Sequence, residues 1–246
     1  MVKLTFYDAR VWKYIIGSIK KIITEGVFVV NEEGLHMRTM DSSHIAMIDI
    51  YVPSTAFEEF EVEGESSIGV NFDELSKIMR RATKGEKLTL SVDEGKLSII
   101  FTGKMVREFK LPMLDISSEK LPEPKVKFNV TARMQSSIFR DMIKDLEPIG
   151  EAVTFNAEEN KLKVKASSER GIAEVILDVE SGALLDLNIK EPSIATYSLD
   201  YLKDISGVAQ AVDIVVLNYS SNMPLKLDFE IPNGGRVTLY LAPRVE

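Results

Sequence analysis

The sequence contains no cysteine, and this absence excludes several kinds of chemistry. Without thiols the chain cannot form disulfides, use a cysteine nucleophile or bind a metal through sulfur. Its 246 residues hold no apolar run close to the roughly 18 to 20 residues that span a bilayer. The start of the chain also lacks the basic segment and apolar core of a secretory signal. We therefore expect an intracellular protein that is not inserted in a membrane.

Histidine is also rare, and acidic residues outnumber basic ones. The only histidines are His36 and His44, and the formal net charge is -8. Residues 1–125 carry 17 Lys and Arg against 20 Asp and Glu, and residues 126–246 carry 13 against 18. Neither half is basic overall, so a binding site for a polyanion has to arise from the local placement of cations.

The short motifs of common enzyme classes are missing as well. We find no HExxH sequence, phosphate-binding loop or dinucleotide fingerprint, and we expect neither catalysis nor a metal or cofactor. One alternative stays open, because Asp41-Ser42-Ser43-His44 contains the residue types of hydrolytic catalysis. An α+β hydrolase could use this loop, although nucleophile and base normally come from separate segments.

Four segments of the sequence follow one plan, an amphipathic helix and then a hairpin of alternating strands. The predicted helices cover residues 9–23, 72–84, 137–146 and 199–209. The predicted hairpin turns fall at residues 31–34, 93–95, 157–160 and 220–222, about 61 to 64 residues apart. This repetition predicts an α+β fold of two similar domains, each with two helix-plus-hairpin units.

The repeat also pairs at a longer spacing, which predicts where the domains begin and end. Residues 34–38 (GLHMR) are echoed by residues 161–165 (KLKVK), and residues 87–90 by residues 214–217. We expect an N-terminal domain at residues 1–114 and a C-terminal domain at residues 126–246. Residues 115–125 lie between them and contain two prolines, which favours an extended connector.

The predicted second helix concentrates positive charge. Its apolar side carries Leu75, Ile78 and Met79, and its other side carries four cations, namely Lys77, Arg80, Arg81 and Lys84. An acidic protein with a cationic helix face is expected to present that face to a polyanion. The alternative is a solvated helix whose cations interact with the negative end of the helix dipole.

Three further stretches resemble one known family. Residues 35–49 read LHMRTMDSSHIAMID, the connector contains Leu-Pro-Glu-Pro at residues 121–124, and residues 240–244 read YLAPR. Together with the order of helices and hairpins along the whole chain, they resemble the sliding clamps of DNA replication. These clamps are the proliferating cell nuclear antigen family, and the chain resembles its archaeal form.

The resemblance implies a ring of three chains around double-stranded DNA, with helices lining the ring and sheets outside. The three chains would be identical, or would be related clamp subunits. A processivity clamp of this kind tethers DNA polymerase, flap endonuclease and DNA ligase, and is opened by a clamp loader. We expect it in the cytoplasm of an archaeon, close to the nucleoid, or in the nucleus if the source is eukaryotic. A ring that signals DNA damage is a third possibility.

The resemblance also assigns residues to three surfaces. The DNA-facing set is Lys13, Lys20, Lys21, Lys77, Arg80, Arg81, Lys84, Arg140, Lys144 and Lys203, of which the last three stand among acidic residues. The set that docks short partner peptides is Met40, Ser43, His44, Ile45, Leu121, Pro122, Pro124, Met223, Pro224, Tyr240, Ala242 and Pro243. Subunits would pair through strands near residues 107–113 and 173–179, with Phe109, Leu111, Val175 and Leu177 as apolar members.

Overall fold

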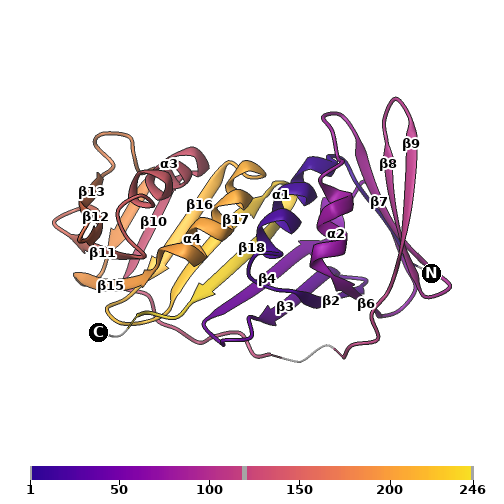
Figure 1. The fold of residues 1–246 in the computed structure, drawn as a ribbon, viewed down its shortest axis with the longest axis horizontal. Helices are drawn as coiled ribbons and strands as arrows, with labels where there is room; N and C mark the ends of the chain where they lie inside the picture. Colours follow the sequence, from indigo (N-terminus) through magenta and orange to yellow (C-terminus); the bar gives the residue numbers. More distant parts are fainter. Residues whose placement is uncertain (1, 118–120, 245–246) are drawn as a thin grey trace.

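Antiparallel strands form most of the regular secondary structure, and a single layer of helices covers one side of them (Figure 1). The computed structural model describes residues 2–117 and 121–244. Residues 118–120 of the predicted connector and the chain ends at 1, 245 and 246 lie outside the described residues. The α-helices are α1 (Ala9–Ile19), α2 (Phe72–Met79), α3 (Ser136–Leu146) and α4 (Leu199–Ile205).

The strands of the first half form two groups. The five-stranded sheet has the order β5-β1-β7-β8-β9, with β1 (Val2–Phe6), β5 (Glu59–Val62), β7 (Lys87–Asp93), β8 (Lys96–Thr102) and β9 (Val106–Pro112). The second group is β2 (Glu25–Asn31), β3 (Gly34–Met40), β4 (Ala46–Pro53) and β6 (Ser66–Asn71).

The strands of the second half repeat this arrangement. One group is β10 (Val130–Gln135), β14 (Asp186–Ile189), β16 (Ile214–Tyr219), β17 (Leu225–Ile231) and β18 (Gly235–Leu241). The other is a four-stranded sheet of order β13-β12-β11-β15, with β11 (Ala152–Glu158), β12 (Lys161–Ser168), β13 (Gly171–Leu177) and β15 (Ser193–Ser198). The expected α+β class with two similar domains is confirmed.

One sheet joins the two halves. Strand β18 pairs with β4 in antiparallel register from Arg236 opposite Tyr51 to Leu241 opposite Ala46. The result is a nine-stranded sheet of order β14-β10-β16-β17-β18-β4-β3-β2-β6. Five of its strands come from the second half and four from the first, so the core is continuous between the domains.

Three of the four helices end earlier than the sequence predicts. α1 stops at Ile19, α2 at Met79 and α4 at Ile205, and a 3-10 helix, η2 (Ser206–Gln210), follows α4. After α1 and α2 the chain tightens into i→i−3 hydrogen bonds, for example from the Ile22 amide to the Ile19 carbonyl. These turns redirect the chain towards the next strand. Arg80, at the C-cap of α2, therefore opens a turn and does not continue the helix.

Four of the predicted hairpin turns are present. They connect β2 to β3, β7 to β8, β11 to β12, and β16 to β17. Residues with positive φ occupy them, including Gly95 (φ 74°), Asn160 (φ 61°) and Asn222 (φ 55°). The asparagines and the glycine tolerate this conformation better than other residues, so the turn signals in the sequence acted as expected.

A chain of aromatic rings fills the core of the first domain. Trp12 on α1 meets Phe6 of β1 and Phe28 of β2 edge to face, with centroid distances of 5.8 and 6.2 Å. Phe28 continues the contact to Phe72, the first residue of α2, at 6.0 Å. The rings tie both helices to both sheets of this domain. Within the described residues, no helix has the length and apolar character needed to cross a membrane.

We predict that Trp12→Ala destabilises the first domain by about 3 to 5 kcal/mol, because it leaves a cavity at the junction of two sheets. Denaturant unfolding followed by circular dichroism measures the change. Met105→Ala is the control, since Met105 is 63% exposed and should cost less than about 1 kcal/mol. Equal shifts for the two variants would contradict a central role for the Trp12 packing.

Candidate nucleic-acid interface and docking surface

The helices form one layer whose neighbours follow the order α2, α1, η2 with α4, and then α3. Figure 1 shows this layer in front of the curved sheets. All ten cations of the predicted DNA-facing set lie on these helices or in the segments that directly follow them. The structure thus places cations from both domains on one layer. Some of them form ion pairs with carboxylates and others do not.

Five of the ten cations are neutralised by nearby carboxylates. The ion pairs are Lys20–Asp73 (3.2 Å), Lys21–Asp204 (3.5 Å), Lys77–Glu74 (2.6 Å), Lys144–Asp141 (3.6 Å) and Lys203–Glu147 (2.5 Å). Each lysine keeps its positive charge, but the carboxylate beside it cancels that charge for any group farther away. These pairs therefore add little to the attraction of a distant polyanion. Sequence patterns show only the pairs that lie within one helix, so the contacts of Lys20, Lys21 and Lys203 could not be foreseen.

The other five cations have no ion pair within the part of the chain that the structure describes. Lys13 donates to the carbonyl oxygen of Ala82 at 3.2 Å, which leaves its charge uncompensated. Arg80, Arg81 and Lys84 are exposed in the segment between α2 and β7. Arg140 is half-buried on α3, and its Nε has no hydrogen-bond partner among the described residues. Net positive charge is therefore concentrated near the end of α2.

Residues of the predicted docking set come together where adjacent strands of the nine-stranded sheet end. Leu225 pairs with Leu241 and Leu241 pairs with Ala46, so the turn before β17, the tail after β18 and the loop before β4 are neighbours. The Ala242 amide donates to the Ile45 carbonyl at 2.9 Å. Met223, Pro224, Ala242, Pro243, Ile45 and the end of β3 at Met40 thus share one edge of the molecule.

A hollow of about 320 Å³ lies beside this edge. Met40 and His44 line it together with Leu121 of the connector, so the structure brings three members of the predicted set into one depression. Pro122, Pro124, Met223, Pro224, Ala242 and Pro243 do not line it. Ser43, Ile45 and Met223 are exposed. Tyr240 lies in strand β18 and is buried, with 6% exposure.

The loop of residues 41–45 is shaped by one buried carboxylate. Asp41 accepts hydrogen bonds from the amides of Ile45 (2.8 Å) and Ala46 (2.7 Å) and from the Tyr201 hydroxyl (2.7 Å). Burial would raise the pKa of Asp41, but these hydrogen bonds outweigh it and hold the pKa below its ordinary value. Burial and the Asp41 contact raise the pKa of Tyr201 to about 12. His44, with a φ of 56°, is left at the tip of the loop.

This geometry does not support the hydrolase alternative. Asp41 is directed to backbone amides and Tyr201, and among the described residues no hydrogen bond joins His44 to Ser42 or Ser43. In the same part of the chain, no three His, Asp or Glu side chains are grouped so that they could hold a metal ion.

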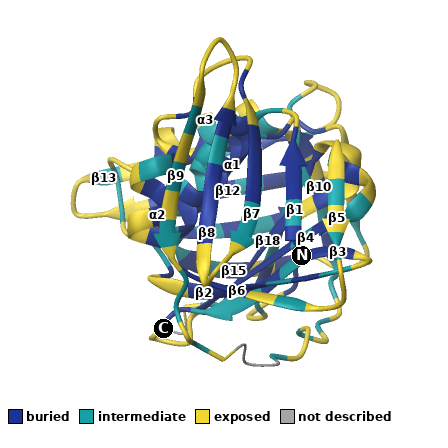
Figure 2. Ribbon diagram, turned by 90° about the vertical axis from the view of Figure 1, so that its right-hand side faces the viewer, coloured by how far each residue is buried: buried dark blue, intermediate teal, exposed yellow. Residues whose placement is uncertain are grey.

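The two strands predicted to pair between subunits are open edges. Among residues 2–117 and 121–244, β9 pairs only with β8 and β13 only with β12, at opposite ends of the molecule (Figure 1). Figure 2 shows β9 as an edge strand on which exposed and half-buried residues alternate. Phe109, Leu111 and Val175 pack against the core, and Leu177 is buried.

Sequence reasoning missed several residues at these edges. The most exposed apolar side chains of the two strands are Val106 (69%), Ile172 (66%) and Ile176 (50%), on the faces opposite the predicted members. Arg107 of β9 also has a defined position, because it donates to both carboxylate oxygens of Glu86 at 2.6 and 2.7 Å. Strict alternation along each strand could have identified the exposed residues.

Comparisons with known proteins agree with this architecture. The family model for the proliferating cell nuclear antigen N-terminal domain matches residues 1–120, and the model for its C-terminal domain matches residues 122–244. The chain belongs to the proliferating cell nuclear antigen family. The family resemblance read from the sequence is therefore confirmed.

Several curated members of the proliferating cell nuclear antigen family match this chain over its whole length. DNA polymerase sliding clamp 3 of Aeropyrum pernix is 45% identical and covers 98% of this chain and 97% of its own. The DNA polymerase sliding clamp of Thermofilum pendens is 40% identical and covers both chains fully. Both organisms are archaea, as the sequence led us to expect.

Solved structures of the family show the same fold. A chain of the PCNA2-PCNA3 complex from Sulfolobus tokodaii superposes with a TM-score of 0.94 at 30% identity, covering 99% of this chain and 100% of that one. PCNA from Thermococcus kodakaraensis also gives a TM-score of 0.94, at 27% identity and with the same coverage.

We predict that the Ala46 amide reports the titration of Asp41. Because the pKa of Asp41 is lowered, the contribution of its hydrogen bonds to stability is complete above about pH 3.9, the ordinary value. It is lost as the pH falls through the lowered pKa. The amide chemical shift of Ala46, followed by NMR, should change with a midpoint below that value. The change should vanish in Asp41→Asn, and a midpoint at or above about pH 3.9 would contradict the assignment.

Proposed function

We propose that this chain is a subunit of a DNA sliding clamp, in which three copies close into a ring around double-stranded DNA. The ring would act as a processivity factor that binds DNA without sequence preference and tethers polymerase, flap endonuclease and DNA ligase through short peptides. A clamp loader would open it. The observation that carries the proposal is the relation between the nine-stranded sheet and the two smaller sheets.

The nine-stranded sheet consists of five strands of the second domain joined to four strands of the first at β18 and β4. The remaining sheets contain the equivalent five strands of the first domain and the equivalent four of the second, in the same spatial order. If β9 of one chain pairs with β13 of the next, the same nine-stranded arrangement forms again. Repeating this head-to-tail contact closes a ring when the rotation fits.

The pairing of β18 with β4 inside one chain also supplies the register for the pairing of β9 with β13 between chains. Phe109 faces Ile99 on β8 as Leu239 faces Leu227 on β17, so Phe109 takes the place of Leu239. By the same comparison Ala173 takes the place of Ile48, which pairs with Leu239. Phe109 would therefore lie opposite Ala173 of the neighbouring chain, a large residue against a small one. Leu111 would lie opposite Gly171.

Charges at the outer face are compatible with a second copy of the same chain as the neighbour. The register places Glu108 opposite Glu174, which alone would be unfavourable. Lys110 lies 3.5 Å from Glu108, and Lys165 is the cross-strand partner of Glu174. These lysines offset the like charges, while the exposed Val106 and Ile176 would cover each other. A related clamp chain at this edge is the alternative that the test below distinguishes.

Two cysteine variants test the register without background, because the chain has no cysteine of its own. Lys110→Cys and Ile172→Cys in one chain would stand directly opposite across the junction, at about 5.5 Å between Cα atoms, within disulfide range. Mild oxidation should give covalently closed trimers on a denaturing gel. Lys110→Cys with Glu174→Cys is the control, because that diagonal pair lies about 7 to 8 Å apart.

The control pair should form at least fivefold less crosslink. Equal yields from both pairs would contradict the register. If the variant folds but its copies form no crosslink, the ring is not closed by copies of this chain. Pairing with a related clamp subunit would then be the remaining explanation.

The proposed DNA contact rests on the uncompensated cations of the helix layer. Contacts to phosphates are independent of sequence and weaken with salt, which suits a ring that must move along DNA. Lys13, Arg80, Arg81, Lys84 and Arg140 should supply most of the attraction, since no carboxylate neutralises them within the described residues. The five paired lysines should contribute less.

We predict that replacing Arg80, Arg81 and Lys84 together with Gln weakens duplex binding by at least tenfold at moderate salt. Fluorescence anisotropy against salt concentration measures it, and the slope of log K against log salt should fall by about 0.9 for each phosphate that the variant no longer neutralises. Lys77→Gln is the matched control on α2, since Glu74 already neutralises Lys77. A control effect as large as one third of the triple variant's would count against charge compensation as the deciding factor.

A further inference from the structure

The connector between the domains crosses the outer face of the nine-stranded sheet and is fixed at both ends. At its start, the Leu114 amide donates to the Gly69 carbonyl of β6 at 2.9 Å. Gly69 allows this approach, because a Cβ there would lie 2.3 Å from the Leu114 oxygen. Beyond the connector, the Asn129 amide donates to Ser220 Oγ at 2.9 Å. The described residues of the connector from Leu121 onward are held by other groups.

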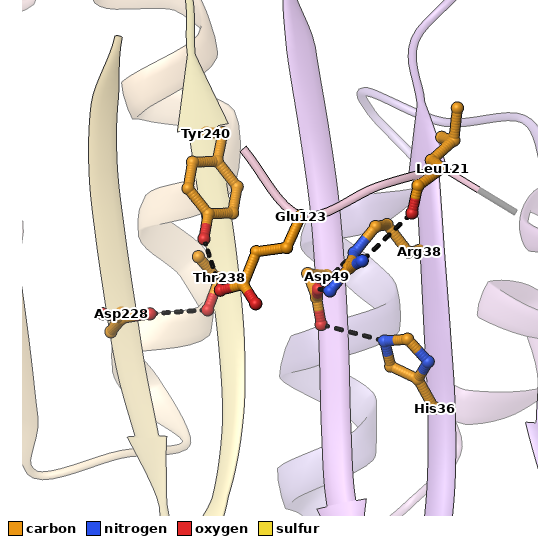
Figure 3. A network of polar contacts seen from close by, with 8 residues as sticks. All are labelled: His36, Arg38, Asp49, Leu121, Glu123, Asp228, Thr238 and Tyr240. Carbon is orange, nitrogen blue, oxygen red and sulfur yellow. Dashed lines mark hydrogen bonds and ion pairs between the residues drawn. The ribbon is translucent and has the colours of Figure 1, made fainter. Parts of the chain in front are cut away.

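Two side chains of the sheet hold the connector at Leu121 and Glu123 (Figure 3). Arg38 of β3 donates from Nη1 to the Leu121 carbonyl at 3.0 Å. Tyr240 of β18 donates from its hydroxyl to a carboxylate oxygen of Glu123 at 3.2 Å. Arg38 belongs to the first domain and Tyr240 to the second, so the connector is attached on both sides of the β4–β18 junction.

Arg38 is itself held by a buried carboxylate. Its Nε donates to Asp49 Oδ2 at 2.6 Å, and its Nη2 makes a second contact with the same oxygen. The other oxygen of Asp49 lies 3.3 Å from His36 Nε2, and the Asp49 side chain is only 3% exposed. Burial would raise the pKa of Asp49, but His36 and Arg38 outweigh it and lower the pKa. The Asp49 carboxylate is thus charged at neutral pH and fixes the Arg38 guanidinium.

The second domain shows that the sheet does not need such a buried pair. By the repeat, Lys165 on β12 and Glu174 on β13 occupy the places of Arg38 and Asp49, and both are exposed. No connector contact is made by either of them within the described residues. The buried ion pair therefore occurs where the connector passes over the sheet. Since burying an ion pair is costly, a specific contact at this place accounts for it better than general stability does.

We propose that Asp49 and Arg38 form a positioning pair that fixes Leu121 and thereby one wall of the docking hollow. Leu121 lines the hollow together with Met40 and His44, so a shift of its backbone changes the space open to a partner peptide. This inference rests on the docking part of the proposed function. Arg38 also lines the hollow, whereas Asp49 does not, so Asp49 acts only through Arg38 and the Leu121 carbonyl.

The experiment uses the assembled 246-residue chain with Arg38→Gln and, separately, Asp49→Asn. Arg236→Gln is the matched control, because Arg236 is an exposed arginine on the same nine-stranded sheet with no hydrogen bond to the connector among the described residues. A spin label on Pro122→Cys, the only thiol in the protein, reports connector mobility by electron paramagnetic resonance. The affinity for a synthetic peptide with a Gln, an aliphatic residue and two aromatics is measured on the unlabelled variants, with the mass in solution.

We expect the label to become more mobile in both test variants, and the peptide affinity to fall about 5- to 10-fold, with the mass unchanged. Arg38→Lys should restore only part of the affinity, because one ammonium group cannot hold Asp49 and the Leu121 carbonyl as the guanidinium fork does. Arg236→Gln should change neither reading.

Unchanged label mobility in Arg38→Gln and Asp49→Asn would overturn the positioning pair. Increased mobility with full peptide affinity would overturn its role in docking. If the unaltered protein binds no such peptide, the docking part of the proposed function fails, and the mobility measurement still decides whether Asp49 and Arg38 hold the connector.

Discussion

The structure depends above all on the antiparallel pairing of β18 with β4. This pairing merges five strands of one domain with four of the other, so the two domains have one continuous sheet and a shared core. β9 and β13 are the equivalents of β18 and β4, and each has one edge with no partner strand within the described residues, at opposite ends of the molecule. An open strand edge invites pairing, and here both edges match a junction that the chain already contains.

The arrangement of charge follows from the same architecture. The chain is acidic overall, yet its helix layer holds cations that no carboxylate neutralises within the described residues, mainly around the end of α2. Lysines elsewhere on the layer are paired, as Lys203 is with Glu147. A layer that is only partly cationic would attract a DNA backbone without holding it tightly, which is compatible with movement along DNA.

The docking edge and the connector depend on the β4–β18 junction as well. The strand ends that bring Ile45 and Ala242 together are neighbours only because β18 pairs with β4. The connector crosses the same junction, held by Arg38 on one side and Tyr240 on the other. A change at this junction would therefore affect both the shared core and the proposed docking surface.

The sequence predicted the elements of the fold better than their contacts. Helix-plus-hairpin units, the α+β class and the turns at Gly95 and Asn222 follow from local periodicity and from residues that accept positive φ. Helix ends were overestimated, because the apolar spacing of residues such as Ile22 continues through the tight turns after the helices. The β4–β18 pairing was not predicted, since strand partners far apart in sequence leave no local signal.

For the candidate sites too, the sequence predicted local features better than long-range contacts. Family resemblance suggested the loop around His44 and the connector, and the structure places Met40, His44 and Leu121 around one hollow. Residues that act through long-range contacts were missed. Arg38 meets the Leu121 carbonyl from a distant part of the chain. The neutralisation of Lys20 by Asp73 also joins separate segments, so it reduces a charge that the sequence shows as free.

The mass of the protein in solution tests the central claim most directly. Sedimentation equilibrium of the unmodified chain at micromolar concentration should give three times the chain mass of 27.6 kDa. Each chain has one β9 edge and one β13 edge, so copies join head to tail, and the proposed ring closes with three of them. A mass of one chain, both alone and after mixing with related clamp subunits, would contradict the account.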